Sequence, residues 1–228
     1  MTQTYPVNEY QVQIASGRTG TIRKAVEEDL PRIAAIHQKA FSNFFLTRLG
    51  GEFLRRYYRL VLRYRAGIVL VSESCGALEG FACGFIDPAE FYRLMSCNSR
   101  LFVLPAMRAL VRQPSLATRV LRAVQRIQRP ASGELAPSCE LSSVAVAPEA
   151  GGRGLGKALV EAFLERAWSM GARRVCLTTD ADANEPANAL YRKTGFQHTR
   201  RFLRYHGRWM NEYVMQRSEA AGSRGMRP

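Results

Sequence analysis

The residues best suited to binding chemistry form a glycine-dense turn between a β-branched run and an amphipathic stretch. Its glycines are Gly151, Gly152, Gly154 and Gly156, and the run before them ends at Val146. Glycine lacks a Cβ, so the backbone can approach a ligand closely and direct successive N–H groups at it. A helix that begins after the turn adds the positive end of its dipole. The turn therefore predicts an anion site, with phosphate or pyrophosphate as the expected guest.

Spacing distinguishes three kinds of phosphate-binding loop. Gly151, Gly156 and Lys157 have the spacing of the nucleoside-triphosphatase loop. Ala158, however, stands where that loop needs a Ser or Thr hydroxyl to hold magnesium. The dinucleotide fingerprint Gly-x-Gly-x-x-Gly, counted from Gly154, needs a glycine at position 159, which is leucine. Both loops are excluded, and the third kind remains.

The third kind is the pyrophosphate loop of the GNAT acetyltransferases, which this stretch resembles. Residues 144–149 read Val-x-Val-x-Pro-Glu, and Gly154 and Gly156 occupy the two glycine positions of the family's Arg/Gln-x-x-Gly-x-Gly/Ala pattern. One position departs from the pattern, because Gly151 stands where the family has Arg or Gln. Arg153 and Lys157 are the neighbouring cations that could compensate, and coenzyme affinity is the property that the departure puts in question.

A second block, at residues 184–196, resembles the same family. It reads Asn-Glu-Pro-Ala-Asn-Ala-Leu-Tyr-Arg-Lys-Thr-Gly-Phe and matches the GNAT pattern Asn-x-x-Ala-x-x-Leu-Tyr-x-Lys-x-Gly-Phe. Two blocks in family order are more specific than either alone. The resemblance extends from Thr21 to Arg217 and is strongest from Glu140 to Phe196. It implies a single-domain α/β fold with a mixed central sheet flanked by helices, and acetyl-CoA as co-substrate of an N-acetyltransferase.

Residue chemistry gives the parts of the second block separate roles. Asn184 is expected to cap a short helix, Ala187 and Leu190 to bury against the sheet, and Gly195 to end the helix in the left-handed conformation. The resemblance implies that Tyr191 lies near the coenzyme sulfur and donates a proton to the departing thiolate. A core tyrosine with a satisfied hydroxyl is the alternative.

Acetyl transfer needs a polarised thioester carbonyl, an amine without its extra proton and a proton for the sulfur. The resemblance assigns the first task to backbone N–H groups of residues 144–146, where two parallel strands splay apart. Glu140, at the start of that strand, is the candidate base, because a carboxylate there can take the ammonium proton directly or through water. A solvated or arginine-paired carboxylate is the alternative.

A covalent scheme through Cys139 is weaker, since the three histidines show no recognisable spacing to it, and direct attack in a ternary complex is expected. The predicted catalytic residues are Glu140 and Tyr191. The predicted coenzyme-binding residues are Val144, Ala145, Val146, Gly151, Gly152, Arg153, Gly154, Leu155, Gly156, Lys157 and Asn184.

Length and composition indicate one soluble domain. The chain has 228 residues, 46% of them hydrophobic, which suffices for one substantial core. No apolar run reaches the roughly 18 residues of a membrane span, and residues 1–20 lack the hydrophobic centre of a signal peptide, which predicts a cytoplasmic protein. Five cysteines show neither the close pairing of zinc sites nor the density of a disulfide scaffold, so no metal is expected.

The net charge of +14 is high for an enzyme of small molecules, and it comes mainly from arginine. A basic surface attracts the phosphates of coenzyme A and an anionic acceptor, or a polyanion or anionic membrane. A solvated surface explains the same charge, because net charge affects association and not chemistry. Specific nucleic-acid binding is not expected.

Alternation and run length predict a mixed order of strands and helices. Strands are predicted at residues 22–26, 68–72, 80–85, 140–146, 175–179, 202–206 and 209–216, and helices at residues 29–41, 51–64 and 155–170. The second and third strands should form a hairpin, and the fifth should lie parallel to the fourth. The domain is expected to span residues 21–217, between a flexible N-terminal segment (1–20) and a disordered tail (218–228).

The least family-like stretch lies at residues 90–137, between the hairpin and the central strand. It has no acidic residue from position 91 to 133, and Val120, Leu121, Val124 and Ile127 recur at helical spacing. A basic helical insertion that packs on the sheet is one interpretation. A lid on the acceptor site, or attachment to an anionic membrane or polyanion, are the others.

No motif encodes the acceptor. Residues 41–58, rich in aromatics and arginines, fall where the family's acceptor-side helices lie, and arginines there suit an anionic acceptor such as a nucleotide-linked amino sugar. Peptide N-termini, lysine side chains and small amines stay open, as does a homodimer. Two alternatives of other classes remain: an acetyl-CoA-binding regulator without turnover, and a basic polyanion-binding module.

Overall fold

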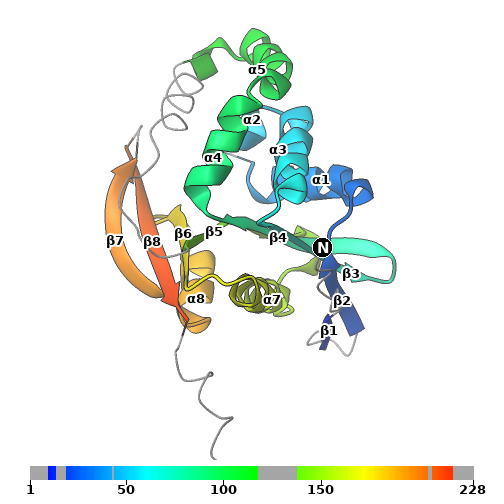
Figure 1. The fold of residues 1–228 in the computed structure, drawn as a ribbon, viewed down its shortest axis with the longest axis vertical. Coiled ribbons are helices and arrows are strands. Elements are labelled where there is room, and N and C mark those ends of the chain that lie inside the picture. The colour runs from blue at the N-terminus through cyan, green and yellow to red at the C-terminus, as the bar shows by residue number, and fades with distance from the viewer. Residues whose placement is uncertain (1–9, 14–18, 43, 118–137, 205–206, 218–228) are drawn as a thin grey trace, which may run out of the picture.

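Over the residues that the structure describes, the protein is an α/β fold with one eight-stranded mixed sheet and helices on both faces (Figure 1). The computed structural model describes residues 10–13, 19–42, 44–117, 138–204 and 207–217. The strands are β1 (Tyr10–Gln13), β2 (Thr19–Lys24), β3 (Gly67–Ser74), β4 (Ala77–Ile86), β5 (Ser138–Val146), β6 (Arg174–Asp180), β7 (Gln197–Arg204) and β8 (Arg208–Gln216). The α-helices are α1 (Leu30–Ala40), α2 (Phe45–Arg48), α3 (Gly51–Arg63), α4 (Pro88–Cys97), α5 (Arg100–Arg112), α7 (Leu155–Ser169) and α8 (Glu185–Lys193).

The strands follow the order β1-β2-β3-β4-β5-β6-β8-β7, and every neighbouring pair is antiparallel except β5 and β6. The predicted hairpin and the predicted parallel pair are therefore confirmed. Two strands differ from the sequence prediction. β1 lies inside the segment expected to precede the first strand, and β7 begins at Gln197 rather than Phe202. β7 is an edge strand with mostly exposed side chains, so its sequence lacks the alternation that marks a half-buried strand.

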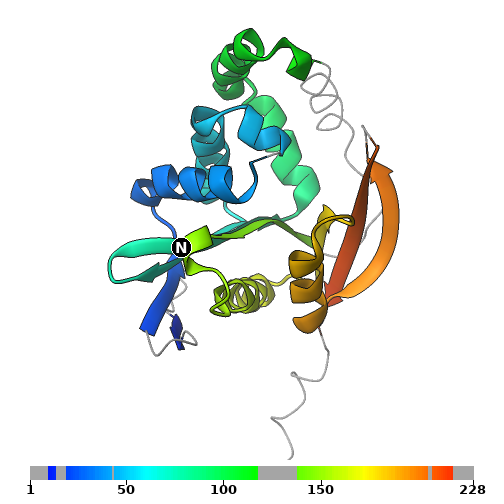
Figure 2. The same ribbon diagram turned by 180° about the vertical axis from the view of Figure 1, so that it is seen from behind.

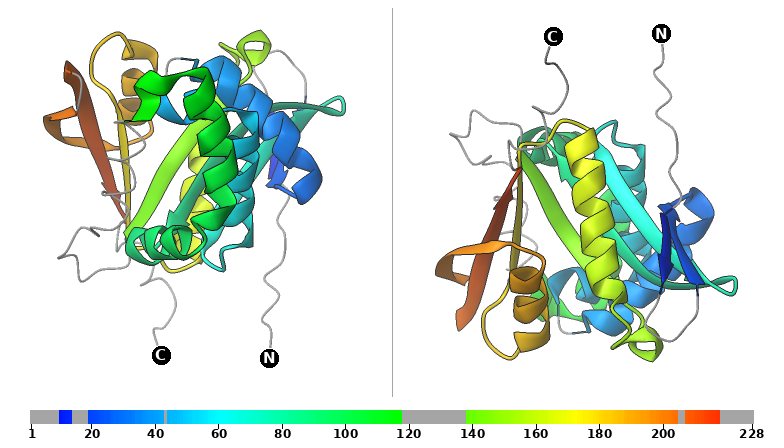
Figure 3. Two further views of the ribbon diagram at one scale, coloured as in Figure 1. Left: turned by 90° about the horizontal axis from the view of Figure 1, so that it is seen from above. Right: turned by 90° about the horizontal axis from the view of Figure 1, so that it is seen from below.

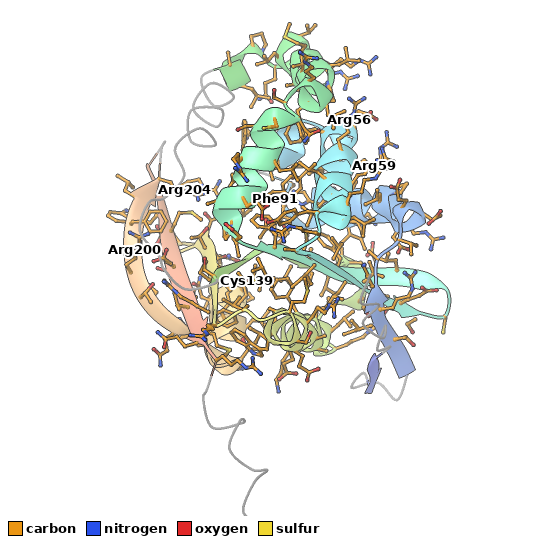
Figure 4. The ribbon with its side chains drawn as sticks, in the orientation of Figure 1. Arg56, Arg59, Phe91, Cys139, Arg200 and Arg204 are labelled. Carbon is orange, nitrogen blue, oxygen red and sulfur yellow. The ribbon has the colours of Figure 1, made fainter. Side chains whose placement is uncertain are left out.

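Helices cover the two faces of the sheet unequally. α1, α3 and α4 lie on one face, and α7 and α8 lie on the other (Figures 2 and 3). Each face has its own apolar cluster: Phe91 of α4 belongs to the first and Cys139 of β5 to the second, and Figure 4 shows them on opposite sides of the sheet. α5 packs on α3, away from the sheet.

The helix α7 has the buried face that its sequence predicts. Leu155, Leu159, Phe163 and Ala167 recur at helical spacing, and all four are buried against the sheet. The helix ends as expected, because Gly171 takes a φ of 90°, a left-handed conformation that glycine adopts without steric penalty. This helix holds the glycine turn at its N-terminal end.

A β-bulge interrupts β5 next to the candidate base. Cys83 pairs with Ser143 and Gly84 with Leu141, so Ser142 is left as the extra residue. A Cβ on Gly84 would lie 2.1 Å from the carbonyl oxygen of Glu140, which only glycine permits. Because side chains alternate along a strand, the extra residue exchanges the two faces of β5 beyond it.

The insertion forms two helices, α4 and α5, in its described first half. The basic amphipathic helix predicted around residues 120–127 lies outside the described residues, as does the predicted tail at 218–228. None of the described helices is long and apolar enough to cross a membrane.

The edge strand β7 is lined by arginines. Arg200 and Arg201 pair with Glu212 and Asp182, and Figure 4 shows Arg200 and Arg204 along this strand. Charged side chains on an edge strand hinder pairing with the edge of another molecule. The exposed edge therefore does not favour a homodimer built by strand pairing.

Candidate active site

The central feature of the site is a wedge between β5 and β6. These strands pair in parallel register only from Ser138 to Glu140, opposite Arg174 to Cys176, and β5 then continues to Val146 alongside β4 alone. The backbone groups of residues 141–146 on the β6 side therefore face a gap instead of a strand. Such an edge can pair with the amides of an extended ligand and present N–H groups to a carbonyl oxygen. The splay predicted for residues 144–146 is present.

The glycine turn forms one wall of a pocket at the wide end of the wedge. The pocket has a volume of about 290 Å³ and is lined by Val146, Ala150, Gly151, Gly152, Gly154, Leu155, Gly156, Pro186, Ala187 and Leu190. Gly152 and Gly154 have φ values of 76° and 78°, which favour glycine, and a Cβ on Gly156 would be 3.5 Å from the Leu190 side chain. Gly152 and Gly154 are thus the two positions of the turn whose backbone favours glycine, while a Cβ on Gly156 would make an ordinary contact with α8.

The N-terminal end of α7 opens at this pocket. Ala158 donates to the carbonyl of Gly154, so the N–H groups before Ala158 in the first turn have no carbonyl within the helix to bind. These groups and the helix dipole favour an anion there. The two cations expected to compensate for Gly151 are held elsewhere: Arg153 binds Glu79 and the carbonyl of Glu149, and Lys157 pairs with Glu161. Neither cation lines the pocket, so the positive groups at its wall are backbone N–H groups.

The structure brings together most of the predicted coenzyme-binding residues but not all of them. Six line the pocket: Val146, Gly151, Gly152, Gly154, Leu155 and Gly156. Five do not: Val144, Ala145, Arg153, Lys157 and Asn184. Ala145 contributes its side chain to the core on the opposite face, beyond the bulge, which leaves only its backbone to the wedge.

The second block differs from its predicted packing in two ways. Asn184 occupies the N-cap position of α8, but its side chain makes no cap and donates to Thr179 Oγ1 at 2.7 Å. Ala187 and Leu190 are only partly buried, because they turn toward the pocket, and Asn188 and Tyr191 form the buried face of α8 instead. The burial predicted for Ala187 and Leu190 is therefore met only in part, because both pack against the apolar cluster of that face and also line the pocket.

Asn188 is a buried polar residue that the sequence analysis did not single out. Its side chain donates to the carbonyls of Asp180 and Asn184, and its oxygen accepts from Asn211 and from the Tyr213 hydroxyl. All its hydrogen-bonding capacity is thereby used. This network ties α8 to β6 and β8 and so fixes the wall of the pocket.

Tyr191 lies on the same side of the sheet as the pocket. Its ring packs against Phe196 and Tyr213, and burial raises its pKa to about 12. The phenol therefore stays protonated at physiological pH. It is available as a donor rather than as a base.

Glu140 lies on the opposite face, at the closed end of the wedge. It is the last β5 residue paired with β6, and its Oε1 accepts a hydrogen bond of 2.9 Å from the Tyr92 hydroxyl on α4. The insertion helix thus contacts the candidate base directly, which no sequence motif indicated. Beside it, Tyr57 of α3 and Ser142 join their hydroxyls at 2.7 Å, so the bulge residue also faces this side.

A third contact closes the acceptor side near the end of β6. The Arg208 guanidinium lies 4.7 Å from the ring centroid of Phe44 and binds both carboxylate oxygens of Asp180. Phe44 belongs to the segment between α1 and α3, and Asp180 ends β6. The predicted acceptor-side segment therefore contacts the β7–β8 hairpin beside the end of β6.

The covalent alternative has little support in the geometry. Cys139 is fully buried, and burial raises the pKa of its thiol far above the usual value. A thiol in that state is a poor nucleophile. All five cysteines are free.

Comparison with known proteins gives partial sequence matches and broad structural ones. The model of the acetyltransferase (GNAT) family matches residues 118–196. Mycothiol acetyltransferases of Pseudarthrobacter chlorophenolicus and of Arthrobacter sp. strain FB24 are 53% and 51% identical over 57 residues. That segment is 25% of this chain and only 17% of either relative, so the similarity concerns a small part of those proteins.

Solved structures resemble the whole fold. The ribosomal-protein-alanine N-acetyltransferase of Brucella melitensis aligns with a TM-score of 0.59 at 23% identity, covering 86% of this chain and 98% of that one. A Salmonella typhimurium protein solved with its cofactor acetyl-CoA aligns with a TM-score of 0.58 at 19% identity, over 89% and 96% of the two chains. The fold resembles that of solved GNAT acetyltransferases, and the family model matches residues 118–196, a stretch that contains the two sequence blocks.

Proposed function

We propose that the protein is an N-acetyltransferase that transfers the acetyl group of acetyl-CoA to a primary amine in a ternary complex. The observation that carries this proposal is the wedge between β5 and β6, which opens directly after Glu140 and widens toward the glycine-lined pocket. An extended acyl thioester fits such a wedge, with its pyrophosphate at the start of α7 and its acyl group toward Glu140.

The residues present suit the coenzyme. Gly152 and Gly154 hold a loop whose amides and adjoining helix end favour a pyrophosphate, and the α8 wall offers apolar contact to a pantetheine arm. Gly151 does not remove the anion site, because the positive field comes from backbone N–H groups. The absent Arg or Gln weakens the site in this proposal but leaves it intact.

The two faces of the sheet divide the chemistry in this proposal. The amine approaches from the face of α3 and α4, where Glu140 takes its proton directly or through water. The amine nitrogen attacks the thioester carbon, a C–N bond forms and the C–S bond breaks. On the other face, Tyr191, whose raised pKa keeps it protonated, donates its proton to the departing sulfur. Backbone N–H groups of β5 beyond Glu140 stabilise the oxyanion.

The acceptor side suggests an anionic or polar amine. Residues 41–58 hold Arg48, Arg55 and Arg56, and Arg208 contacts Phe44 of the same segment. A cytoplasmic location is part of this proposal, because all five cysteines are free and two are buried without oxidation.

A thermal titration with acetyl-CoA tests the coenzyme site, with ATP as a control for anion binding. A ligand specific for the native state raises the melting temperature by about 5–10 °C when it is a hundredfold above its Kd. A saturable rise with acetyl-CoA alone supports the proposal, and a screen of amines for release of free thiol follows. An equal rise with ATP, or none, contradicts it and favours the polyanion-binding alternative.

Binding without thiol release from any amine would favour a regulator that lacks turnover. The two outcomes are distinguishable, because the titration reports occupancy and the thiol assay reports transfer. Steeply salt-dependent binding to RNA, with no response to acetyl-CoA, would identify the polyanion module.

A further inference from the structure

Exposed apolar side chains are concentrated on one helix of the insertion. The described part of the chain has eight large hydrophobic residues that are exposed, and five of them belong to α5: Leu101, Val103, Leu104, Met107 and Val111. Val111 is 79% exposed and the other four are about half exposed. Single exposed apolar residues are ordinary, but a group of this size on one element marks a contact surface.

Helix geometry places four of these residues in one stripe. At 3.6 residues per turn, Val103, Leu104, Met107 and Val111 fall within an arc of about 100°. The opposite side of α5 is buried: Phe102 packs on Phe53 of α3 with ring centroids 5.0 Å apart. α5 is therefore amphipathic, with its second apolar stripe directed away from the protein.

Arginines border the stripe. Arg108 and Arg112 lie between the exposed stripe and the buried side of α5, where they line a hollow of about 610 Å³ between α3 and α5. Arg48 and Arg55 line the same hollow from the other side. Its acidic residue, Glu52, is already paired with Arg55 and Arg56. The hollow thus carries a net positive charge beside an apolar stripe.

The position of α5 makes the surface accessible. The helix is the outermost element on its side of the sheet, while α7 and the glycine turn lie on the other side (Figures 1 and 2). A flat surface can meet α5 without covering the pocket at the start of α7. Docking there is compatible with coenzyme entry.

We propose that α5 and the arginine-lined hollow dock onto an anionic phospholipid membrane surface. The four aliphatic side chains of the stripe enter the boundary between headgroups and acyl chains, and the arginines bind lipid phosphates. A nucleic acid or a free anion would use the arginines but leave the aliphatic stripe in water. A lipid surface satisfies both parts, and the sequence keeps carboxylates out of residues 91–133, where they would repel it.

Vesicle flotation with the full chain tests the proposal. Vesicles of phosphatidylcholine alone are compared with vesicles of equal parts phosphatidylcholine and phosphatidylglycerol. The protein should float with the anionic vesicles and not with the neutral ones, and binding should weaken as salt is raised. Equal binding to both kinds of vesicle, or to neither, overturns the proposal.

Two sets of variants separate the apolar and charged contributions. Leu104→Ser, Met107→Ser and Val111→Ser combined should lower the partition coefficient about tenfold or more. Arg100 is exposed at the start of α5. Its change to Gln, combined with Arg108→Gln and Arg112→Gln, should lower the partition coefficient about a hundredfold, since each basic residue near the surface contributes about fivefold. A loss in the arginine variant without a loss in the serine variant identifies an anion site only and overturns the membrane assignment.

Matched controls have the same chemistry elsewhere on the surface. Leu203→Ser on β7 removes another exposed leucine, and Lys24→Gln, Arg32→Gln and Arg173→Gln combined remove three other exposed cations. Both controls should retain binding, and an equal loss in them overturns the proposal.

Two further measurements exclude other occupants. Inorganic phosphate that fully prevents the protein from binding to anionic vesicles indicates a site for free anions and overturns the proposal. Gel filtration of the chain without vesicles detects a second copy bound on this surface. A dimer that the serine variant disrupts, together with no binding to vesicles, also overturns the membrane proposal. All variants should keep their stabilisation by acetyl-CoA, so a failure here is distinct from a failure of the proposed activity.

Discussion

At the scale of single residues, the proposed catalytic side chains lie on opposite faces of one sheet. Glu140 contacts Tyr92 on the α4 side, and Tyr191 packs with Tyr213 on the α8 side. A thioester between the strands would therefore have its base and its acid on different sides.

The change Glu140→Gln should lower kcat by about a hundredfold or more at neutral pH. The amide cannot accept the ammonium proton, and the remaining rate should rise with pH as the amine loses that proton unaided. Turnover measured across pH with the acceptor that the screen identifies checks this. Glu165→Gln, an exposed carboxylate of α7, is the control and should behave as wild type. Wild-type turnover in the Glu140 variant would remove this residue from the mechanism.

The change Tyr191→Phe should lower kcat by about a hundredfold and leave the acetyl-CoA titration unchanged. Phenylalanine keeps the ring contacts with Phe196 and Tyr213, so the fold should be retained. Because burial raises the pKa of Tyr191 to about 12, the wild-type rate should show no loss of this proton below about pH 10. Single-turnover rates with and without the hydroxyl give the comparison. An unaltered rate would assign Tyr191 to the core alone.

At the scale of elements, the loop and the helix act as one unit. Gly154 is both the last residue of the turn and the N-cap of α7, in a left-handed conformation that fixes how the first N–H groups point. α8 faces this unit with side chains that the sequence pattern marked as core. Ala187 and Leu190 line the pocket together with the glycines of the turn.

The change Gly154→Ala should weaken acetyl-CoA binding and destabilise the fold together. A left-handed alanine costs about 1–2 kcal/mol, and relaxation of that strain redirects the N–H groups of the turn. Gly171→Ala is the matched control, because Gly171 has a φ of 90° at the other end of the same helix. It should lose similar stability and keep its affinity. Thermal unfolding with and without acetyl-CoA separates the two effects, and equal affinities in both variants would contradict the prediction.

At the scale of the whole molecule, a buried histidine in the core between α1, α3 and the sheet should make the free energy of unfolding depend on pH. His37 is 3% exposed, its Nδ1 lies 2.6 Å from the Tyr58 hydroxyl, and its Nε2 is buried without a partner among the described residues. Burial lowers its pKa to about 4, so the ring is neutral in the folded protein. The unfolded chain binds a proton near pH 6.5, which the folded protein does not.

The free energy of unfolding should therefore fall as pH decreases from about 6.5 to about 4. The slope is about 1.4 kcal/mol per pH unit for this one group, to a total of about 3 kcal/mol. Carboxylates with lowered pKa act below about pH 4.5, so denaturation between pH 6.5 and 5 isolates the histidine. His37→Gln should flatten the curve there, and an equal slope in that variant would contradict the assignment.

The sequence predicted those parts of the molecule whose function requires a particular residue type. The turn was predicted from its glycines, α7 from the spacing of its apolar residues, and the parallel pair of strands from the order strand, helix, strand. Tyr92, Asn188 and the bulge at Ser142 could not be predicted, because their roles depend on which distant elements meet them. β7 was misplaced because an exposed edge strand has no buried face to create a pattern.

Because β5 and β6 pair over so short a length, the sheet consists of two parts, β1–β5 and β6–β8, that are connected only at the start of β5. Three residue pairs join the two parts directly. Within the second part, the hydrogen bonds of Asn188 hold β6 and β8 to α8. A pantetheine arm carries amides of its own, so a bound coenzyme would form hydrogen bonds with the unpaired backbone of β5 and fill the gap like an additional strand. In the proposed mechanism, each catalytic cycle would therefore bridge the gap between β5 and β6 and open it again. Free coenzyme A would leave through the same gap in which acetyl-CoA had been bound.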